Sequence, residues 1–498
     1  MESIWSQTVE IKEREPLKGD RFVEVAVIGG GMAGILTAYY LQKQGKEVIV
    51  LEADRIGSGQ TKDTTAKITS QHGKIYSALI EEYGEKKARL YVKANEEAVK
   101  EYGRLVANEK IECHFERRNS YLYSVSDEEE LKKETKAAEK LGAPAYFTKE
   151  TPFPFPVTGA VCFEKQAQFH PLEFLKSISE NLTVYEQTPV IYVAGHTIDT
   201  KQGKVTAKHI VFATHYPFPN MPGFYFARQH QERSYVLAIS DIPKWEGMYY
   251  SIDREGLSFR WFEDILLVGG GGHRTGKQNA QSGYEKLVKG VKINYPECDF
   301  SLLENQNEST AEKGRHKGKV IAYWSAQDCI SHDDLPFIGR FSMLRPYWYV
   351  ATGFKKWGMT DSMISARLIC DQICGQENIY ESLFTPQRLN LFASWKRLCL
   401  DLKISTLGLI KGHFYLPIAK KEMPEKGQAK ILRVGLKRYG IYCDLQGILH
   451  KVSVKCPHLG CELEWNDAEK SWDCPCHGSR FDYDGNLIDN PSQISIND

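Results

Sequence analysis

The pattern of apolar positions is clearest near the N-terminus, where it predicts a buried strand, a glycine turn and a buried helix. Residues 22–28 carry Val, Ala and Ile, a glycine-rich turn follows over 29–34, and apolar residues continue to Leu41. A second run of Val, Ile and Leu over 46–53 is typical of another buried strand. Residues 87–107 have helical periodicity. This order of elements predicts an α/β unit.

The rest of the chain alternates strands, loops and helices until its character changes near residue 410. The pattern favours a helix over 126–142, whereas three prolines make 151–159 a loop. Near 348–376 it again predicts a strand, a glycine turn and a helix. Beyond about 413 it predicts short strands and turns, so we place the main domain boundary near 410.

Composition and charge place the chain among ordinary globular proteins. Of its 498 residues, 42% are hydrophobic and 26% are charged, which excludes a disordered or collagen-like chain. Lys and Arg number 64, as do Asp and Glu, so the charge balance does not indicate nucleic acid or an anionic membrane as a partner. The N-terminus has no apolar secretory segment, and the uncharged stretch 25–41 contains four glycines. We therefore expect no transmembrane segment and a soluble, cytoplasmic protein.

The glycine turn after the first strand is a candidate nucleotide site. Its residues are Gly29, Gly30, Gly31, Met32, Ala33 and Gly34. They fit G-x-G-x-x-G between a strand and a helix, which is the context that this motif requires. A pyrophosphate would lie on the positive helix N-terminus, and Glu52, at the end of the second strand, would bond the ribose hydroxyls. The motif therefore predicts dinucleotide binding.

The sequence around this motif resembles the D-amino-acid oxidase/glycine oxidase class of FAD enzymes. The likeness continues through 56–73 and returns at 332–339 and 349–360. It implies FAD as the cofactor and a set of flavin contacts in the later segments. Thr65, Ala66 and Lys67 would lie along the flavin edge, Asp334 and Gly339 near the ribityl-phosphate part, and Gly353, Gly358 and Met359 near the ring.

Three further side chains are candidates for catalysis. Arg260 falls where this class of enzymes presents substrate-facing strands, and a buried arginine there could clamp a substrate carboxylate. An ion pair at a domain boundary is the alternative for Arg260. Lys355 lies in the expected flavin-facing turn, and His273 could be a base or part of a loop surface. The segment 269–276 is glycine-rich but lacks the G-x-G-x-x-G spacing, so we expect no NAD(P)H site there.

The cysteines indicate a metal centre near the C-terminus. Five of the twelve lie beyond residue 440, and four of these stand with histidines in two boxes, CPHLGC over 456–461 and CPCHGS over 474–479. A Cys-x-His and a Cys-x-x-His can hold a [2Fe–2S] cluster, with two thiolates on one iron and two imidazoles on the other. A Cys₂His₂ zinc site is the alternative, although it would leave one cysteine in each box unexplained.

The two boxes resemble those of the Rieske proteins of respiratory and photosynthetic cytochrome complexes. The resemblance implies that Cys456 and Cys474 bind one iron, that His458 and His477 bind the other, and that Cys461 and Cys476 form a disulfide. It also implies a hydrogen bond from Ser479 to a cluster sulfur. Phe481 departs from the high-potential members of that family, which have tyrosine there. Ring-hydroxylating oxygenases also carry Rieske domains, but roughly 20 residues after the cluster leave no room for their mononuclear iron site.

Together, the resemblances predict an α/β plus all-β protein, similar to a bacterial family of FAD–Rieske fusions. A Rossmann-type FAD domain would be interleaved with an α+β substrate domain and followed by a small antiparallel β Rieske domain. The predicted divisions are an N-terminal surface extension (1–21), the FAD domain (22–110, 160–220 and 325–376), the substrate domain (111–159 and 221–324), a helical connector (377–412) and the Rieske domain (413–498).

We therefore expect an FAD-dependent oxidoreductase that oxidises a small amine or amino acid. Because flavin handles two electrons and the cluster one, the cluster would pass electrons singly to an acceptor protein or quinone, or the flow would run in reverse. An electron-transfer protein without a small-molecule substrate and a redox sensor without turnover are the alternatives. A closed pocket that contains Arg260 beside the flavin favours the enzyme, whereas a flavin edge open to a partner favours the electron-transfer protein.

Overall fold

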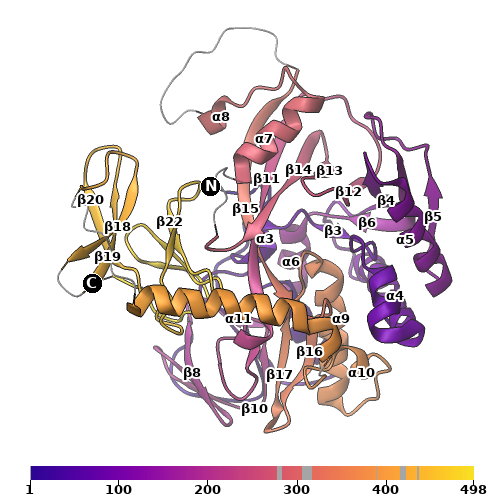
Figure 1. Cartoon of the computed structure of the whole chain (residues 1–498). Helices are drawn as coiled ribbons and strands as arrows, with labels where there is room; N and C mark the ends of the chain where they lie inside the picture. Colours follow the sequence, from indigo (N-terminus) through magenta and orange to yellow (C-terminus); the bar gives the residue numbers. More distant parts are fainter. Residues whose placement is uncertain are drawn as a thin grey trace.

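The computed structural model describes residues 2–277, 283–304, 317–388, 390–414, 422–434 and 437–497. Figure 1 shows two large β-sheets with helices around them and a smaller C-terminal β unit on one side. A long helix runs from the larger body to this C-terminal unit. No helix among the described residues has the length and apolar composition to span a membrane.

The first sheet has eight strands and contains the predicted nucleotide-binding unit. Its strands are β1 (Arg21–Ile28), β2 (Val48–Leu51), β7 (Thr183–Tyr185), β8 (Val190–Ala194), β9 (Thr197–Thr200), β10 (Lys204–Phe212), β16 (Phe337–Ser342) and β17 (Arg345–Thr352). The main order is β16-β17-β10-β1-β2-β7, and β9 joins β8 to β10. β1 pairs in parallel with β2 and β10, which pairs in parallel with β17. The first strand of the sequence therefore lies inside a parallel sheet.

The second sheet has nine strands and is mostly antiparallel. Its strands are β3 (Lys67–Ile68), β4 (Glu116–Ser124), β5 (Ala145–Thr148), β6 (Gly159–Gln168), β11 (Gln229–Ser240), β12 (Met248–Ser251), β13 (Ser258–Phe262), β14 (Ile265–Arg274) and β15 (Lys319–Ser331). The order is β15-β11-β14-β13-β12-β4-β6-β3, with β5 on β6. β6 and the end of β15 belong here because they pair with β4 and β11. The predicted divisions instead placed 160–168 and 325–331 in the FAD domain.

Helices cover both sheets, and one helix begins at each of the two glycine turns. They are α2 (Met32–Lys43), α3 (Gln60–Asp63), α4 (Tyr76–Asn108), α5 (Glu128–Leu141), α6 (Pro171–Ser179), the 3₁₀ turn η1 (Tyr225–Ala227), α7 (Gly283–Asn294), α8 (Ser301–Glu304), α9 (Gly358–Cys374) and α10 (Glu381–Phe384). α2 follows β1, α9 follows β17, and the two helices contact each other. Two helix N-termini thus lie at the ends of nearby strands of the first sheet.

The N-terminal segment is not the irregular surface extension that the sequence predicts. It contains α1 (Ile4–Thr8), and the Trp5 side chain is fully buried. The Trp5 indole donates a hydrogen bond to the Thr64 backbone oxygen at 2.7 Å, and its ring packs edge-on against His170 and Phe262. A single tryptophan among polar residues gives no periodic signal, although burial of so large a ring contributes strongly to packing. The segment therefore closes the larger body next to the loop that precedes β3.

The C-terminal unit consists of two small antiparallel sheets after α11 (Leu391–Phe414). Their strands are β18 (Ala429–Val434), β19 (Lys437–Cys443), β20 (Leu449–Ser453), β21 (Glu464–Asn466), β22 (Ser471–Asp473), β23 (Arg480–Asp482) and β24 (Leu487–Asp489). The first three form one sheet and the last four form the other. Buried Val452, Leu463, Trp472 and Phe481 pack with the box cysteines into a core of their own. The change of pattern near 410 thus coincides with the end of the connecting helix.

Candidate active site and metal centre

The glycine turn between β1 and α2 is closed so tightly that two of its positions accept only glycine. Gly29 has φ +110°, and a Cβ there would lie 2.4 Å from the Ala213 backbone oxygen. A Cβ at Gly34 would lie 1.9 Å from the Gly29 oxygen. Gly31 directly precedes Met32, the first residue of α2. The turn thus leaves the helix N-terminus close to the strand end, which is the arrangement that binds pyrophosphate.

Glu52 follows β2 beside this turn, as the motif predicts. Its carboxylate accepts hydrogen bonds from the Gly30 backbone N–H at 2.6 Å and from the Asp54 N–H at 2.9 Å. Burial raises the pKa of Glu52, while these hydrogen bonds act in the opposite direction. The carboxylate is therefore fixed by the backbone at the end of the parallel sheet, where a ribose would lie.

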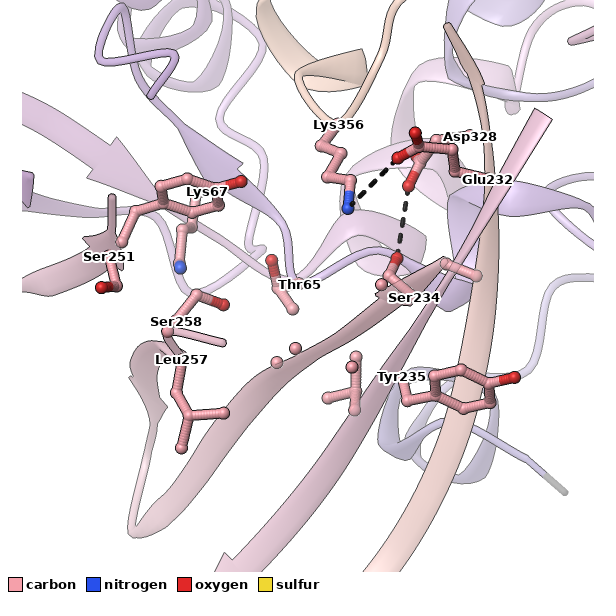
Figure 2. Close-up of a pocket in the computed structure, with 18 of the residues that line it drawn as sticks. Thr65, Lys67, Glu232, Ser234, Tyr235, Ser251, Leu257, Ser258, Asp328 and Lys356 are labelled. Carbon is pink, nitrogen blue, oxygen red and sulfur yellow. Dashed lines mark hydrogen bonds and ion pairs between the residues drawn. The ribbon is translucent and has the colours of Figure 1, made fainter. Parts of the chain in front are cut away.

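Residues from three distant parts of the sequence meet at one cavity of about 290 Å³ (Figure 2). Thr65 and Lys67 come from the segment around β3, and Met359 comes from the first turn of α9. All three were predicted to lie along or near the flavin. Gly353 lies in the turn from β17 to α9 that leads to this cavity, and Gly358 is the first residue of α9. The fold therefore brings the segments predicted to face the flavin to one place.

The surroundings of Gly353 offer hydrogen-bonding groups that the described chain does not use. Gln229 Nε2 and Ser331 Oγ are buried and have no partner among the described residues. A Cβ at Gly353 would lie 3.4 Å from Ser331 Cβ and 3.5 Å from Gln229 Oε1, so both side chains border this turn. Buried polar groups are normally satisfied, and the carbonyls and ring nitrogens of a flavin offer partners of the required kind. The residues present therefore fit the predicted cofactor.

The cavity lining carries charged side chains of both signs. Figure 2 shows the Lys67 amine between Ser251 and Ser258. This amine donates to the Tyr249 backbone oxygen at 3.0 Å, and burial together with the charge of Arg260 lowers the pKa of Lys67 to about 7. Among the described residues, no carboxylate forms an ion pair with Lys67. A cation or neutral amine flanked by hydroxyls therefore occupies this side.

Two carboxylates and the Lys356 amine lie on the other side of the cavity. Glu232 lies 4.0 Å from the Lys356 amine, and Asp328 accepts a hydrogen bond from Ser234 at 3.3 Å (Figure 2). Burial raises the pKa of Asp328 to about 6. The sequence did not single out these residues, because Glu232 and Asp328 lie on paired strands β11 and β15 that are distant in sequence. Lys356 had a weak signal as the neighbour of Lys355 in the flavin-facing turn.

Arg260, predicted as a substrate clamp or an ion-pair partner, forms no ion pair with any described residue and does not line the cavity. Its side chain is buried, and its guanidinium donates to the backbone oxygens of Thr65 at 2.8 Å, Ala66 at 2.9 Å and Phe169 at 3.2 Å. It also lies over the Trp5 ring at 5.2 Å. Arg260 therefore holds the segment that carries Thr65 and Ala66, which favours a structural role over the predicted substrate clamp.

Lys355 and His273 also lie away from the cavity lining. Lys355 forms an ion pair with Asp334, which pairs in addition with Arg397 of α11 at 2.6 Å. The His273 ring stacks on Tyr235 with the ring centroids 5.7 Å apart. Gly339, predicted with Asp334, is in β16, where a Cβ would approach the side chain of Gln372. These placements favour supporting roles for Lys355 and His273 rather than contact with a substrate.

The two Cys/His boxes come together in the C-terminal unit. The Cys456 and Cys474 thiols are buried and hydrogen-bonded to each other. The His458 and His477 rings are perpendicular, with centroids 4.9 Å apart. Both Nδ1 atoms are buried and have no hydrogen-bond partner within the described chain. Two thiols and two unpartnered imidazole nitrogens form the donor set of a [2Fe–2S] centre with mixed ligands, so these residues fit that cluster.

The remaining box residues support this donor set. Cys461 and Cys476 are joined by a disulfide that ties the two loops together. Ser479 Oγ accepts a hydrogen bond from the Ser492 N–H at 2.9 Å and is within hydrogen-bonding reach of Cys456. Phe481 is fully buried in the same core as the ligand cysteines. The disulfide thus accounts for the one cysteine in each box that a zinc site would leave unexplained.

Both histidines of the boxes make contacts with the larger body. His458 Nε2 lies 2.7 Å from the Asn220 side-chain oxygen. The His477 ring hydrogen-bonds the backbone of Phe226 and is edge-on to its ring, with centroids 5.9 Å apart. These contacts fix the tautomer in which Nε2 carries the proton and leave Nδ1 for a metal. The loop over 220–226 therefore orients the candidate ligands from outside their own domain.

Strands β11 and β15 form the wall between the cavity and the two boxes. Gln231 and Gln327 donate hydrogen bonds to the backbone oxygens of His477 at 2.8 Å and Gly478 at 2.9 Å. Their sequence neighbours, Glu232 and Asp328, line the cavity. Because side chains alternate across a strand, one sheet layer presents one set of residues to the cavity and the other to the boxes. The cavity and the candidate metal centre thus share a wall one strand layer thick.

A buried ion pair reinforces this contact. Arg233 of β11 pairs with Glu469 of the C-terminal unit, and the side chains are 2% and 6% exposed. Although burial acts to raise it, the charges of Arg233 and Arg480 hold the pKa of Glu469 at about 2. Removal of one partner from such a buried pair leaves an uncompensated charge and costs about 3–5 kcal/mol. The contact between the two parts of the molecule is therefore a packed interface.

Two protein families match separate parts of the chain. The family described as DAO, FAD dependent oxidoreductase, matches residues 24–372, and the Rieske [2Fe-2S] domain matches residues 413–497. The Bacillus subtilis protein YhfW, whose name describes a Rieske 2Fe-2S iron-sulfur protein, is 35% identical over 99% of this chain and 96% of its own. Gamma-glutamylputrescine oxidoreductase of Escherichia coli is 23% identical and covers 72% of this chain and 85% of its own. The crystal structure of glycine oxidase from Geobacillus kaustophilus matches 74% of this chain and 99% of its own, with a TM-score of 0.59 and 17% identity.

Proposed function

This chain belongs to the DAO family of FAD-dependent oxidoreductases and carries a C-terminal Rieske domain, and from that membership we propose that it couples oxidation of a small amine or amino acid to one-electron transfer. The predictions of FAD, a [2Fe–2S] cluster and oxidoreductase activity are confirmed by the two family matches. When bound, FAD takes up two electrons from an organic substrate and the cluster carries one electron at a time. The substrate, the relay and its direction are the proposal.

The observation that carries the proposal is the shared wall of β11 and β15. Gln231 and Glu232 are adjacent in β11, yet one bonds the box that contains His477 and the other lines the cavity. A substrate oxidised in the cavity would therefore release its electrons one sheet layer away from the cluster. A flavin protein with an unrelated passenger domain would not need a hydrogen-bonded contact at this place.

We assign the site residues accordingly. The FAD contacts are the glycine turn with Met32, Ala33 and Glu52, the segment 65–67, Asp334, Gly339, Gly353, Gly358 and Met359. Cys456 and Cys474 would hold one iron, and His458 and His477 the other. Asn220 and Phe226 would keep the two imidazoles in the tautomer that leaves Nδ1 free for iron. The larger body would then bind FAD, the C-terminal unit would bind the cluster, and β11 and β15 would lie between the two cofactors.

The polarity of the cavity supports an amine or amino acid as the substrate. Lys67, flanked by Ser251 and Ser258, can bind a carboxylate, and the carboxylates Glu232 and Asp328 can bind an ammonium group. Oxidation of the C–N bond to an imine would release two electrons and two protons. This charged lining favours a small polar substrate over an electron-transfer protein without one, which would need an exposed flavin edge.

The experiment is an anaerobic titration of the holoprotein with matched pairs of amino acids and the corresponding amines. The expected result is bleaching of the flavin absorbance by at least one compound, followed by appearance of the EPR signal of the reduced cluster in the same sample. Lys67→Met should weaken the response to amino acids, whereas Lys74→Met, at an exposed lysine paired with Glu130, should not. If no compound bleaches the flavin, or if bleaching never reduces the cluster, the proposal fails.

A further inference from the structure

Arg274 contacts the second Cys/His box, which contains the candidate ligands Cys474 and His477. It is the last residue of β14, and its side chain is 12% exposed. Its Nε donates to the Pro475 backbone oxygen at 3.1 Å, and one terminal nitrogen donates to the Cys476 oxygen at 3.0 Å. Pro475 and Cys476 lie between Cys474 and His477. A guanidinium that cannot lose its charge is thus fixed against the loop that carries two of the four candidate ligands.

The other terminal nitrogen of Arg274 is paired with Asp401 of the connecting helix α11. The second carboxylate oxygen of Asp401 lies 3.1 Å from His230 Nδ1 and 2.5 Å from His332 Nε2. All three residues are buried. His230, His332 and Asp401 have the composition of a metal site, but Arg274 occupies the carboxylate and supplies the positive charge that a metal would bring. The group is therefore an ion-pair network. Its cation, Arg274, contacts the box directly, whereas its anion, Asp401, contacts Arg274.

We propose that the pair Arg274–Asp401 sets the redox potential of the cluster, with the two charges acting in opposite directions. Reduction adds one negative charge to the cluster. A fixed positive charge at the loop between Cys474 and His477 stabilises that added charge and raises the potential. Asp401 partly offsets the guanidinium and lowers it. Because the site is buried, these charges are screened less than they would be at a surface.

This role differs from that of the other ion pair at the interface. Glu469, the partner of Arg233, belongs to the C-terminal unit, so that pair joins the two parts directly. Arg274 instead bonds the box through its backbone, and its charged partner comes from the connecting helix. Arg274 and Asp401 are positioning residues in this account, since neither touches a substrate. The inference needs only a loaded cluster and does not depend on the proposed substrate or relay.

The test is an EPR-monitored redox titration of the full holoprotein. Potentials are measured at pH 9, above the usual titration range of imidazoles, so that a change of charge at His230 does not cancel the change at residue 401. At a fixed applied potential, Arg274→Gln should lower the ratio of reduced to oxidised cluster about tenfold. This corresponds to a redox potential lower by about 59 mV. Asp401→Asn should shift the ratio upward. Arg274→Lys should retain most of the potential, and Arg89→Gln, at an exposed pair with Glu85, should leave it unchanged.

The opposite signs separate an electrostatic role from a merely structural one. A loosened loop would move the potential in the same direction in both variants. If Arg274→Gln does not retain its cluster, Asp401→Asn still decides, because it keeps the shape of the side chain and changes only its charge and one acceptor. A downward shift or no shift in Asp401→Asn overturns the proposal, and so do shifts of the same sign in Asp401→Asn and Arg274→Gln. Absence of any oxidisable substrate would overturn the proposed function without affecting this inference.

Discussion

Gln231 donates a hydrogen bond to the backbone oxygen of His477 at 2.8 Å, while its neighbour Glu232 lines the cavity on the other side of the same strand. The alternation of side chains along β11 therefore places the candidate substrate site and the cluster box on opposite faces of one layer. The same arrangement recurs on β15 with Gln327 and Asp328. In this arrangement, electrons could pass between the two centres without movement of the C-terminal unit.

Gly276→Ala should separate the cluster box from the larger body. A Cβ at this glycine would lie 2.4 Å from the Pro475 backbone nitrogen, which cannot move as a flexible side chain would. We expect reduction of the cluster by substrate to slow about tenfold or more, with flavin bleaching unchanged, when both are followed by anaerobic stopped-flow absorbance.

Gly19→Ala is the matched control for this variant. Gly19 has φ +70° and Gly276 has φ +68°, so both substitutions carry the same backbone strain of about 1 kcal/mol. No atom of the described residues lies within 4 Å of a Cβ at Gly19. Equal electron-transfer rates in Gly276→Ala and Gly19→Ala would show that contact at Pro475 does not matter for transfer.

Arg260→Met should impair FAD retention and stability rather than substrate affinity. The change removes the donor to three backbone oxygens, those of Thr65, Ala66 and Phe169, and each unsatisfied buried acceptor costs about 1–3 kcal/mol. The FAD content after gel filtration and the midpoint of thermal unfolding should both fall. A variant with full FAD content, an unchanged midpoint and a raised KM would restore Arg260 as a substrate clamp.

The His230–Asp401 contact should make stability depend on pH near neutrality. Burial acts to lower the pKa of His230, but its hydrogen bonds to Asp401 and Glu232 outweigh this and raise it above 6.5. A raised pKa in the folded state means that the stabilisation is complete below about pH 6.5 and is lost as the pH rises through the raised value. The difference in thermal midpoint between the native protein and His230→Gln should therefore shrink from pH 6 to pH 9. A difference that grows over this range would contradict the assigned contact.

Phe481→Tyr should raise the redox potential of the cluster. Phe481 is buried in the core that contains the ligand cysteines, and tyrosine adds only a hydroxyl donor to the same ring. A hydrogen bond to a cluster sulfur stabilises the reduced state, and about 1–2 kcal/mol of differential bond energy corresponds to roughly 40–90 mV. EPR-monitored titration of both proteins measures this shift. An unchanged or lower potential with the cluster intact would place the hydroxyl away from the sulfurs.

The parts of the fold that could be predicted from the sequence are those in which neighbouring residues act together. The turn over 29–34 and the two Cys/His boxes are compact motifs, in which the spacing of residues along the sequence determines how they are arranged in space. The two family matches confirm the cofactors that these motifs predicted. By contrast, Trp5 and Arg260 act on Thr64, Thr65 and Ala66, which are distant in sequence, so nothing near either residue indicates its partner.

The interface between the larger body and the C-terminal unit could not be predicted from the sequence, for a different reason. The start of β11 reads Gln-His-Gln-Glu-Arg-Ser over 229–234, a polar run that by composition belongs on a surface. In the structure Gln231 and Arg233 are buried because the C-terminal unit covers them. A polar strand that faces another domain cannot be distinguished from one that faces water until both domains are placed.

We propose that electrons leave the substrate site through the cluster. The most direct test is anaerobic stopped-flow mixing of the holoprotein and of Cys474→Ser with an oxidisable amine or amino acid and a one-electron acceptor. Cys474→Ser removes one candidate ligand of the cluster and leaves the cavity residues untouched. We expect the variant to lose the EPR signal, to keep its FAD, to show flavin bleaching by substrate, and to reduce the acceptor at least about tenfold more slowly. Unchanged acceptor reduction in a variant without the cluster would contradict this proposal.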